Sequence, residues 1–380
     1  MRLTEPRPLL QQGMLVLAVV LLFALVAGNV QANIARLNIE VGFGFLQRTA
    51  GFDIAQALIP YPHSATYLRA ILVAFVNTAL VAVVSIVAGT VLGLFVALAR
   101  LAANPLVSLL ALAYIEAVRN IPLLLQLFFW YFSVLGSLPL PRQSLDLLGA
   151  VFLNKRGLSL PAPVAEPGLF PFLVVAAAAL VAAWLLLRRA RRLRIASGRP
   201  QPALLAAAAG CLLALLVYPL VFGRPVAWQL PELHGFNIAG GVAIIPEFVA
   251  MAVGMSVYGS AFIAELIRGG ILTVGKGQTE AGLALGLSRA RIYARIITPQ
   301  VFRAVIPPLT GQYITLLKNS SLAAAIGYPD LMLIVAGTTL NQTGQPLEVM
   351  AVAMGCYLLL NLLISLAGTA LDRRMRIVER

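Results

Sequence analysis

Long apolar stretches recur along this chain and limit its possible folds more than any other feature. A helix needs about 20 apolar residues to cross a hydrocarbon core about 30 Å thick. The chain is 60% hydrophobic, only 11% charged and has a mean hydropathy of +0.92, outside the range of soluble domains. The apolar stretches predict about eight spans, near residues 10–28, 70–98, 119–138, 169–187, 203–222, 245–268, 301–320 and 347–370.

The spanning elements are expected to be helices, because lipid offers no hydrogen-bond partner to an open backbone. A transmembrane barrel would instead show short alternating segments, which the sequence lacks. The sequence therefore predicts an all-α polytopic membrane protein. Arg2 and Arg7 precede the first apolar run, as in a signal peptide, but the run is long for one. We expect it to remain as an anchor.

The distribution of lysine and arginine predicts the orientation. With the N-terminus in the cytoplasm, twenty of these residues lie on the cytoplasmic side and seven outside, as the positive-inside rule favours. The C-terminus and the segment 271–300 then also lie in the cytoplasm. The net charge of +14 thus reflects topology and needs no nucleic-acid partner. The arginine-rich segment 188–200 is expected to act as a stop-transfer signal, with anionic lipid as the alternative ligand.

Catalytic and metal-binding patterns are missing from the sequence. The string Gly275-Lys276-Gly277 lacks the spacing of a phosphate-binding loop. Cys211 and Cys356 lie far apart in apolar runs, where buried and inert thiols are expected. The two histidines, His63 and His234, have no cluster of metal ligands beside them. The chain is therefore not expected to be an enzyme or to bind a metal, and active transport would need energy from elsewhere.

The hydrophilic segment 271–300 contains the most specific pattern. Its spaced residues are Glu280, Ala281, Gly282, Gly286, Ile296 and Pro299. Gly286 has no Cβ and can adopt a sharp turn, so we expect two short helices joined there. A long polar loop in such an apolar chain predicts a docking site for a soluble partner protein.

This pattern resembles the EAA loop of ABC importer permeases, Glu-Ala-Ala-x3-Gly-x9-Ile-x-Leu-Pro. The spacing matches throughout, although Gly282 replaces the second alanine and Thr298 the leucine. The segments 261–271, 307–322 and 114–132 resemble those that flank the loop, or form the second core helix, in polar amino acid permeases. The resemblance implies a type I ABC importer permease core and assigns the loop to coupling with an ATPase.

The same resemblance divides the chain. Residues 1–69 would be an anchor with a periplasmic loop, and 70–138 and 244–375 the two parts of the core. Residues 139–243, with two extra spans, resemble the insertion of the longer permeases for general, or glutamate, glutamine, aspartate and asparagine, L-amino acids. The segments 29–69 and 139–168 are expected to be loops with short interfacial helices.

The function implied by this resemblance is ATP-driven import of polar L-amino acids across a bacterial inner membrane. The expected partners are a second similar permease in a heterodimer, two ATPase subunits, a periplasmic amino acid binding protein and membrane lipid. ATP and Mg would bind to the ATPase subunits, so this chain would hold no cofactor itself. The alternative is a secondary transporter driven by an ion gradient, although the spans contain few of the carboxylates that it would use.

Polar residues at membrane depth are the candidates for the translocation path, because such residues are costly unless functional or paired. These candidates are Asn77, Thr78, Gln126, Gln312, Tyr313, Thr315, Lys318, Asn319, Ser320 and Ser321. For each of them, helix packing is the competing role. Pro307 and Pro308 are expected to kink or begin the seventh span.

Two acid–base pairs have helical i, i+3 spacing near the cytoplasmic ends of spans. They are Glu116 with Arg119 and Glu265 with Arg268. Each is expected to form an ion pair on a helix surface and to serve as a structural anchor.

Overall fold

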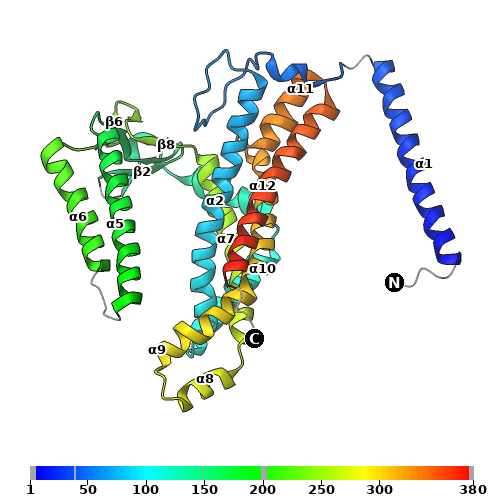
Figure 1. Cartoon of the computed structure of the whole chain (residues 1–380). Coiled ribbons are helices and arrows are strands. Elements are labelled where there is room, and N and C mark those ends of the chain that lie inside the picture. The colour runs from blue at the N-terminus through cyan, green and yellow to red at the C-terminus, as the bar shows by residue number, and fades with distance from the viewer. Residues whose placement is uncertain (1–5, 38–39, 148, 198–202, 376–380) are drawn as a thin grey trace. The chain divides into compact units, whose positions relative to one another are not determined.

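The computed structural model describes residues 6–37, 40–147, 149–197 and 203–375. It divides into two compact units: Met1–Trp130 with Ala250–Arg380, and Tyr131–Val249. Most described residues are helical, and the ribbon in Figure 1 shows long helices as the main elements of both units. The expectation of a helical membrane fold is confirmed.

Five helices are long and apolar enough to span a membrane among the described residues: Gln11–Leu37, Tyr67–Arg100, Leu169–Ala190, Pro246–Thr273 and Pro346–Met375. A bent pair of helices, described below, makes a sixth if the pair is counted as one span. The predicted spans at 203–222 and 301–320 fall in helices α6 (Ala203–Phe222) and α10 (Thr298–Asn319), which do not meet the same criteria. The structure is therefore compatible with about eight spans without confirming that number.

The predicted third span, 119–138, is wrong as a single helix. Helix α3 (Pro105–Asn120) already begins at Pro105, and the chain then bends by 102° before the helical segment Leu123–Ser137. The break falls at Ile121 and Pro122. Proline has no N–H to donate and disfavours a helical residue before it, so the sequence Ile-Pro ends α3 here. The second arm consists of α4 (Leu123–Phe128), η2 (Phe129–Val134) and η3 (Leu135–Ser137).

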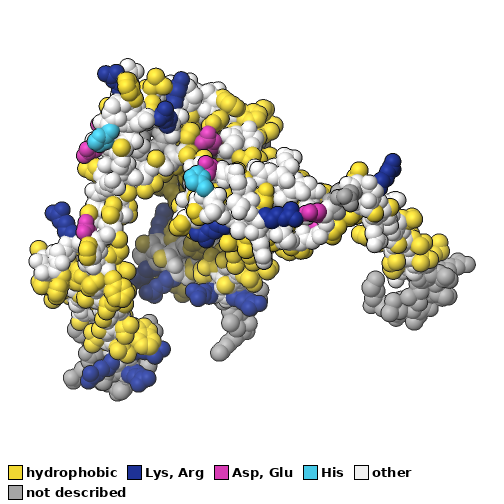
Figure 2. Space-filling model, turned by 90° about the horizontal axis from the view of Figure 1, so that it is seen from above, with side chains coloured by type: hydrophobic (Ala, Val, Ile, Leu, Met, Phe, Trp, Pro, Cys, Tyr) yellow, Lys and Arg dark blue, Asp and Glu magenta, His cyan; other side chains and the backbone are white. Residues whose placement is uncertain are grey.

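Large hydrophobic side chains remain exposed on the long helices. In α1 (Pro6–Leu37), Phe23 is 70% exposed, and in α12 (Pro346–Met375) Leu358 is 67% exposed. Figure 2 shows hydrophobic side chains over much of the visible surface. Contiguous exposed apolar surface of this extent is typical of a protein surrounded by lipid.

Four long helices of the first unit lie alongside one another: α2 (Tyr67–Arg100), α7 (Pro246–Thr273), α10 and α12 (Figure 1). Glycines permit close approach: a Cβ on Gly93 of α2 would lie 2.9 Å from the Ser260 carbonyl oxygen of α7. Helix α10 crosses α12 at Thr310, where a side chain on Gly368 would overlap the threonine. It also continues through Pro307 and Pro308, so the expected helix start there is wrong.

The hydrophobic core of this unit includes a loop that precedes α2. Phe45, in η1 (Phe43–Gln47), is fully buried and packs edge-on against Tyr67 at a centroid distance of 6.1 Å. Leu331 and Val349 belong to the same cluster. Gly42 N donates to Glu348 Oε1 at 2.7 Å, which attaches the loop to the start of α12. The expected loop at 29–69 is thus helical up to Leu37 and packed into the core after Gly42.

The second unit contains the helices α5 (Leu169–Ser197) and α6, which pack against each other, and short antiparallel strands. A four-stranded sheet has the order β1-β2-β3-β8, from β1 (Leu145–Leu147), β2 (Val151–Asn154), β3 (Gly157–Leu160) and β8 (Val242–Ile244). The pairs β4 (Ala162–Ala165) with β5 (Val226–Gln229), and β6 (Glu232–His234) with β7 (Asn237–Ala239), form two ribbons. The expectation of loops with interfacial helices at 139–168 is corrected: apart from η4 (Pro141–Gln143), this segment forms strands.

The remaining elements of the first unit connect its long helices. Helices α8 (Lys276–Ala284) and α9 (Arg289–Ile292) follow α7, and η5 (Tyr293–Ile297) joins α9 directly to α10. After α10 come η6 (Ser320–Ile326), η7 (Met332–Thr339) and α11 (Leu340–Thr343), which lead to α12. Helices α8 and α9 lie beyond the lower end of the helix group in Figure 1.

Candidate functional site

The turn between α8 and α9 is closed by backbone hydrogen bonds around Gly286. Gly286 has φ +73°, in the left-handed region that favours glycine. Its N–H donates to the Leu283 carbonyl oxygen at 2.9 Å, and Leu287 N–H donates to that of Gly282 at 3.1 Å. This pair of bonds is the Schellman arrangement that ends a helix. The expected two short helices joined at a glycine are confirmed.

The two short helices pack through Gly282. This glycine is buried, and a Cβ built on it would lie 2.8 Å from Cγ1 and 2.9 Å from Cδ1 of Ile292. Ile292 is fully buried. The close approach explains why glycine occupies the place of the second alanine in this segment, because an alanine methyl would overlap the isoleucine side chain.

Substitution of Gly282 by alanine is expected to loosen this packing. Overpacking costs about 1–3 kcal/mol, so α8 and α9 should open more often. Trypsin should then cut at Arg289 and Arg291 about fivefold faster in purified protein. Gly277→Ala, which adds a methyl group on the same helix where a Cβ meets nothing within 4 Å, should keep cleavage slow. Equal cleavage of Gly282→Ala and the wild type would show that the contact does not hold the turn.

Glu280, Leu283 and Leu285 are exposed on α8 and its C-terminal cap. Leu283 is 44% and Leu285 79% exposed. Glu280 takes part in none of the ion pairs found among the described residues. Exposed leucines on a segment that is otherwise polar suit contact with another protein. The sequence prediction included Glu280 but missed both leucines, although the run Leu283-Ala284-Leu285 in a polar loop was a usable signal.

The other residues of the predicted pattern lie in or just beyond these helices. Ala281 is exposed on α8, Ile296 is half-buried in η5, and Pro299 lies in the first turn of α10. The six residues thus belong to one continuous segment that ends where α10 begins.

Two of the residues predicted to line the translocation path make hydrogen bonds that stabilise the fold. Gln126 is buried, and its Nε2 donates to the carbonyl oxygens of Val118 and Ile121, both at 2.9 Å. These carbonyls lie at the end of α3 where the helix is broken. Asn77 is fully buried, and its Nδ2 donates to the carbonyl oxygens of Gln56 at 2.8 Å and Pro329 at 3.0 Å. These hydrogen bonds directly support the helix-packing role for Gln126 and Asn77.

The candidates on α10 and η6 cluster at one place. Lys318, Asn319, Ser320 and Ser321 cover the junction of the two helices, with Lys318 exposed and Ser320 fully buried. One turn or more before them lie Gln312 and Thr315, and Tyr313, whose hydroxyl lies 3.0 Å from Thr90 Oγ1 on α2. Helix α4, which contains Gln126, packs against η6. The structure therefore brings the junction near Gln126.

A carboxyl group that the sequence prediction overlooked lies behind this junction. Asp330, in the connection between η6 and η7, is fully buried. Its Oδ1 accepts a hydrogen bond from Leu333 N at 2.8 Å, and its Oδ2 accepts one from the Tyr357 hydroxyl at 3.3 Å. Burial raises the pKa of Asp330 to about 7, since removal from water disfavours the charged form. A single Asp between apolar residues was its only sequence signal.

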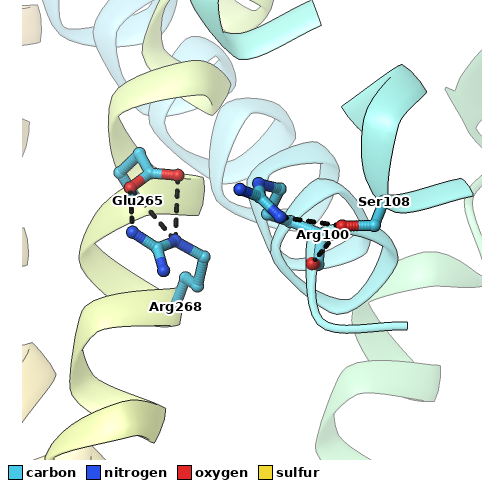
Figure 3. A network of polar contacts seen from close by, with 4 residues as sticks. All are labelled: Arg100, Ser108, Glu265 and Arg268. Atoms are coloured by element: carbon cyan, nitrogen blue, oxygen red, sulfur yellow. Dashed lines mark hydrogen bonds and ion pairs between the residues drawn. The ribbon is translucent and has the colours of Figure 1, made fainter. Parts of the chain in front are cut away.

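A network of charged residues lies at the ends of α2 and α7 (Figure 3). Arg268 donates to Glu265 Oε2 at 2.7 Å, which confirms the predicted pair. Arg100 donates to Ser108 Oγ at 2.7 Å, and both Arg100 and Arg119 interact electrostatically with Glu265. The predicted pair of Glu116 with Arg119 is wrong. Glu116 instead accepts from Asn120, and Arg119 lies 5.2 Å from the centroid of Phe262.

Neither cysteine forms a disulfide, and both are partly buried. Within the described part of the chain, the histidines, cysteines and acidic residues form no group of three or more that would suit a metal ion. His63 and His234 each lie near one carboxylate on the exposed surface, with Nδ1 of His63 3.0 Å from Asp53 Oδ1.

Comparisons with known proteins add independent evidence. The family described as "Binding-protein-dependent transport system inner membrane component" matches residues 89–377. The chain is 45% identical to the putative amino-acid ABC transporter permease protein YhdX of Escherichia coli, over 98% of this chain and 95% of that protein. It is 43% identical to the general L-amino acid transport system permease protein AapQ of Rhizobium johnstonii, over 93% and 88%.

Two further proteins are similar. The glutamate/glutamine/aspartate/asparagine transport system permease protein BztB of Rhodobacter capsulatus is 32% identical, over 93% of this chain and 89% of BztB. Among solved structures, one described as "an amino acid ABC transporter with histidines" aligns with a TM-score of 0.47 and 21% identity, over 81% of this chain and 95% of that one.

Proposed function

The chain belongs to the family of binding-protein-dependent transport system inner membrane components, and we propose how it performs transport within an importer. It is a permease subunit of an amino acid ABC transporter, a class that works with an ATPase and a binding protein. Its relatives favour this function over the secondary transporter that the sequence left as the alternative.

The exposed segment around Gly286 carries the proposal. In it, α8 and α9 dock as a unit on the ATPase, with Glu280, Leu283 and Leu285 in contact. The support is the combination of a glycine-closed turn, tight packing at Gly282 and leucines that the chain itself leaves exposed. ATP and Mg bind to the ATPase subunits in this proposal, and this chain supplies neither a catalytic group nor a cofactor site.

The assembly proposed here contains a second, similar permease, two ATPase subunits and a periplasmic binding protein. Both chain ends lie in the cytoplasm, as the distribution of arginine and lysine favours. The substrates are polar L-amino acids, which accords with the glutamate, glutamine, aspartate and asparagine in the name of BztB. The amino acid passes the junction of α10 and η6, where Lys318, Asn319 and Ser321 offer charged and polar groups.

The coupling step is a shift between two packings of the permease. Closure of the ATPase pair on ATP moves the docked α8–α9 segments and favours the outward-open packing, and hydrolysis restores the inward-open one. ATP can shift this equilibrium only if the ATPase binds the two packings with different affinities. The exposed surface at Glu280 and Leu285 is where that difference in affinity would arise.

Replacement of Glu280 by arginine tests the proposal. Reversal of one interfacial charge costs about 1–2 kcal/mol at a partly exposed site, so ATP-driven uptake should fall about tenfold. The measurement is uptake of labelled glutamate, glutamine and leucine by proteoliposomes that hold the complete importer, with and without ATP. Glu280→Gln, which removes the charge without reversing it, should have a smaller effect.

Three outcomes are distinguishable in this assay. ATP-dependent uptake that Glu280→Arg reduces supports both the importer function and the coupling role. Normal uptake by Glu280→Arg with its ATPase bound would remove Glu280 from the coupling surface. Uptake by the wild type without ATP would contradict the importer function altogether and favour an ion-gradient-driven carrier.

A further inference from the structure

Three arginines at one end of the first unit lie around a single carboxylate. Arg268 donates from Nε to both oxygens of Glu265 at 3.1 Å and from Nη2 to Oε2 at 2.7 Å, so these two charges cancel within α7. Neither Arg100, the last residue of α2, nor Arg119, in the last turn of α3, forms an ion pair with a residue that the structure describes. Two positive charges are therefore left without an anion.

Helix packing brings Arg100 to the level of the ion pair on α7. Gly89 and Gly93 of α2 lie against Ser256 and Ser260 of α7, with 3.2 and 2.9 Å between a Cβ built on the glycine and the facing carbonyl oxygen. The two helices therefore run side by side in the same direction. Two turns further, Arg100 reaches the level of the ion pair. Figure 3 shows it between that pair and the α3 hydroxyl that it binds.

Arg119 reaches the same place from α3. Its guanidinium carbon lies 5.2 Å from the centroid of the Phe262 ring, a distance typical of a cation–π contact. Phe262 and Glu265 are one turn apart on α7 and so lie on one face of it, and Arg119 interacts electrostatically with Glu265. Glu116, one turn before Arg119, accepts from Asn120 Nδ2 and forms no ion pair with a described arginine.

One donor of Arg100 is left without an acceptor. Its Nη1 donates to the Ser108 hydroxyl at 2.7 Å, and that hydroxyl donates to the Arg100 carbonyl oxygen at 2.9 Å. Its Nε is buried and has no hydrogen-bond partner among the described residues. Buried donors are normally satisfied by the protein, by water or by an ion. Because a serine leaves the charge of the guanidinium unbalanced, an anion is the ligand that suits this group.

The surroundings of these arginines suit a lipid. Helix α2 ends at Arg100 and α3 begins at Pro105, so the charges lie at the ends of apolar helices. Leu98, Leu106 and Leu109, on either side of this turn, are exposed. Basic groups between the ends of membrane spans bind the headgroups of anionic lipids, and exposed leucines beside them suit acyl chains. The planar fork of an arginine can bind two oxygens of one phosphate.

We propose that Arg100 and Arg119 bind the phosphate of an anionic phospholipid, with Arg268 as an adjacent positive charge. The lipid joins the turn between α2 and α3 to the end of α7, just before the segment that leads into α8. In the proposed orientation it belongs to the cytoplasmic leaflet. Lipid binding requires no step of transport, so this inference can fail while the proposed function holds, and the reverse.

Binding of phosphatidylglycerol to the purified, delipidated importer tests the site, with native mass spectrometry as the readout. The wild type should bind the first phosphatidylglycerol per copy of this chain about fivefold more tightly than phosphatidylcholine, whose phosphate is balanced by a choline cation. Arg119→Gln should weaken phosphatidylglycerol binding about tenfold, because it removes a charge-assisted hydrogen bond. Arg100→Gln should do the same. If Arg100→Gln fails to assemble, the exposed Arg119 decides.

Arg374→Gln is the matched control. Arg374 is also an exposed arginine in the last turn of a long apolar helix, α12, but it does not interact with Glu265 or Phe262. Diffuse attraction between the protein and anionic lipid would weaken equally in Arg374→Gln and Arg119→Gln. A site built by Arg100 and Arg119 predicts that Arg374→Gln binds phosphatidylglycerol within about twofold of the wild type.

Competition with soluble anions identifies the source of the phosphate. Inorganic phosphate and free glutamate, each in millimolar excess, should not displace the lipid, because neither has acyl chains. Displacement by either would overturn the lipid assignment and make the arginines a site for soluble anions. Wild-type affinity for phosphatidylglycerol in both Arg100→Gln and Arg119→Gln, or equal losses in Arg119→Gln and Arg374→Gln, would overturn the proposal.

Discussion

Uptake by the importer should fall at least 30-fold when Gly286 is replaced by valine. Gly286 adopts φ +73°, where a residue with a Cβ costs about 1–2 kcal/mol and a β-branched one more. About 2 kcal/mol corresponds to a factor of about 30. The substituted chain is expected to relieve the strain by opening the turn, which breaks the bonds of Gly286 N and Leu287 N and changes the angle between α8 and α9.

Gly277→Ala is the matched control for this substitution. Gly277 lies inside α8, and a Cβ built on it meets nothing within 4 Å. Alanine favours a helix over glycine by about 1 kcal/mol, so uptake should remain normal. The measurement is ATP-dependent uptake at equal amounts of membrane-inserted protein. Uptake by Gly286→Val within threefold of the wild type would show that the turn geometry is not needed for coupling.

Replacement of Leu285 by aspartate should weaken ATPase binding at least about 100-fold. Leu285 is 79% exposed beside the turn, and burial of a leucine against a partner contributes about 1.5–3 kcal/mol. The substitution loses this contribution and also places an unpaired charge in the interface, at a further cost of about 1–3 kcal/mol.

The affinity of the purified permease for the ATPase, titrated in detergent, measures this effect. Leu285→Met is the control, because it conserves apolar character and approximate volume, and its affinity should stay within threefold. A wild-type affinity in Leu285→Asp would place the interface elsewhere. Loss of affinity in both variants would instead indicate that leucine shape, and not only polarity, decides docking.

The sequence predicted the helices and the glycine turn because their signals are local. Apolar runs of span length and a glycine between two polar helices each depend on a few neighbouring residues. The strands at 145–165 and 226–244 were missed because segments of three or four residues carry too little alternation to be recognised. The bend at Ile121–Pro122 was readable from its proline, but the apolar run on both sides hid it.

The errors in the predicted side-chain contacts have a different cause. Arg119 was paired with Glu116 on helical spacing alone, yet it lies over Phe262, far along the chain. Asp330 and Tyr357 likewise meet only because α12 returns beside η7. Contacts between distant segments depend on how helices pack, which spacing within one helix does not encode. The exposure of Leu285 was not predicted either, because whether an apolar side chain in a polar loop is buried depends on what packs over that loop.

The crossing of α10 and α12 at Thr310 and Gly368 has a mechanical consequence. Helix α10 has 22 residues, so it is about 33 Å long at 1.5 Å per residue. Thr310 lies near its middle, with the α9 end on one side and the Ser320 end on the other. A rod that pivots at its middle moves its two ends in opposite directions. We therefore expect α10 to act as a lever: an inward pull on the arm that adjoins η5 would swing the junction of α10 and η6 outward by a comparable distance.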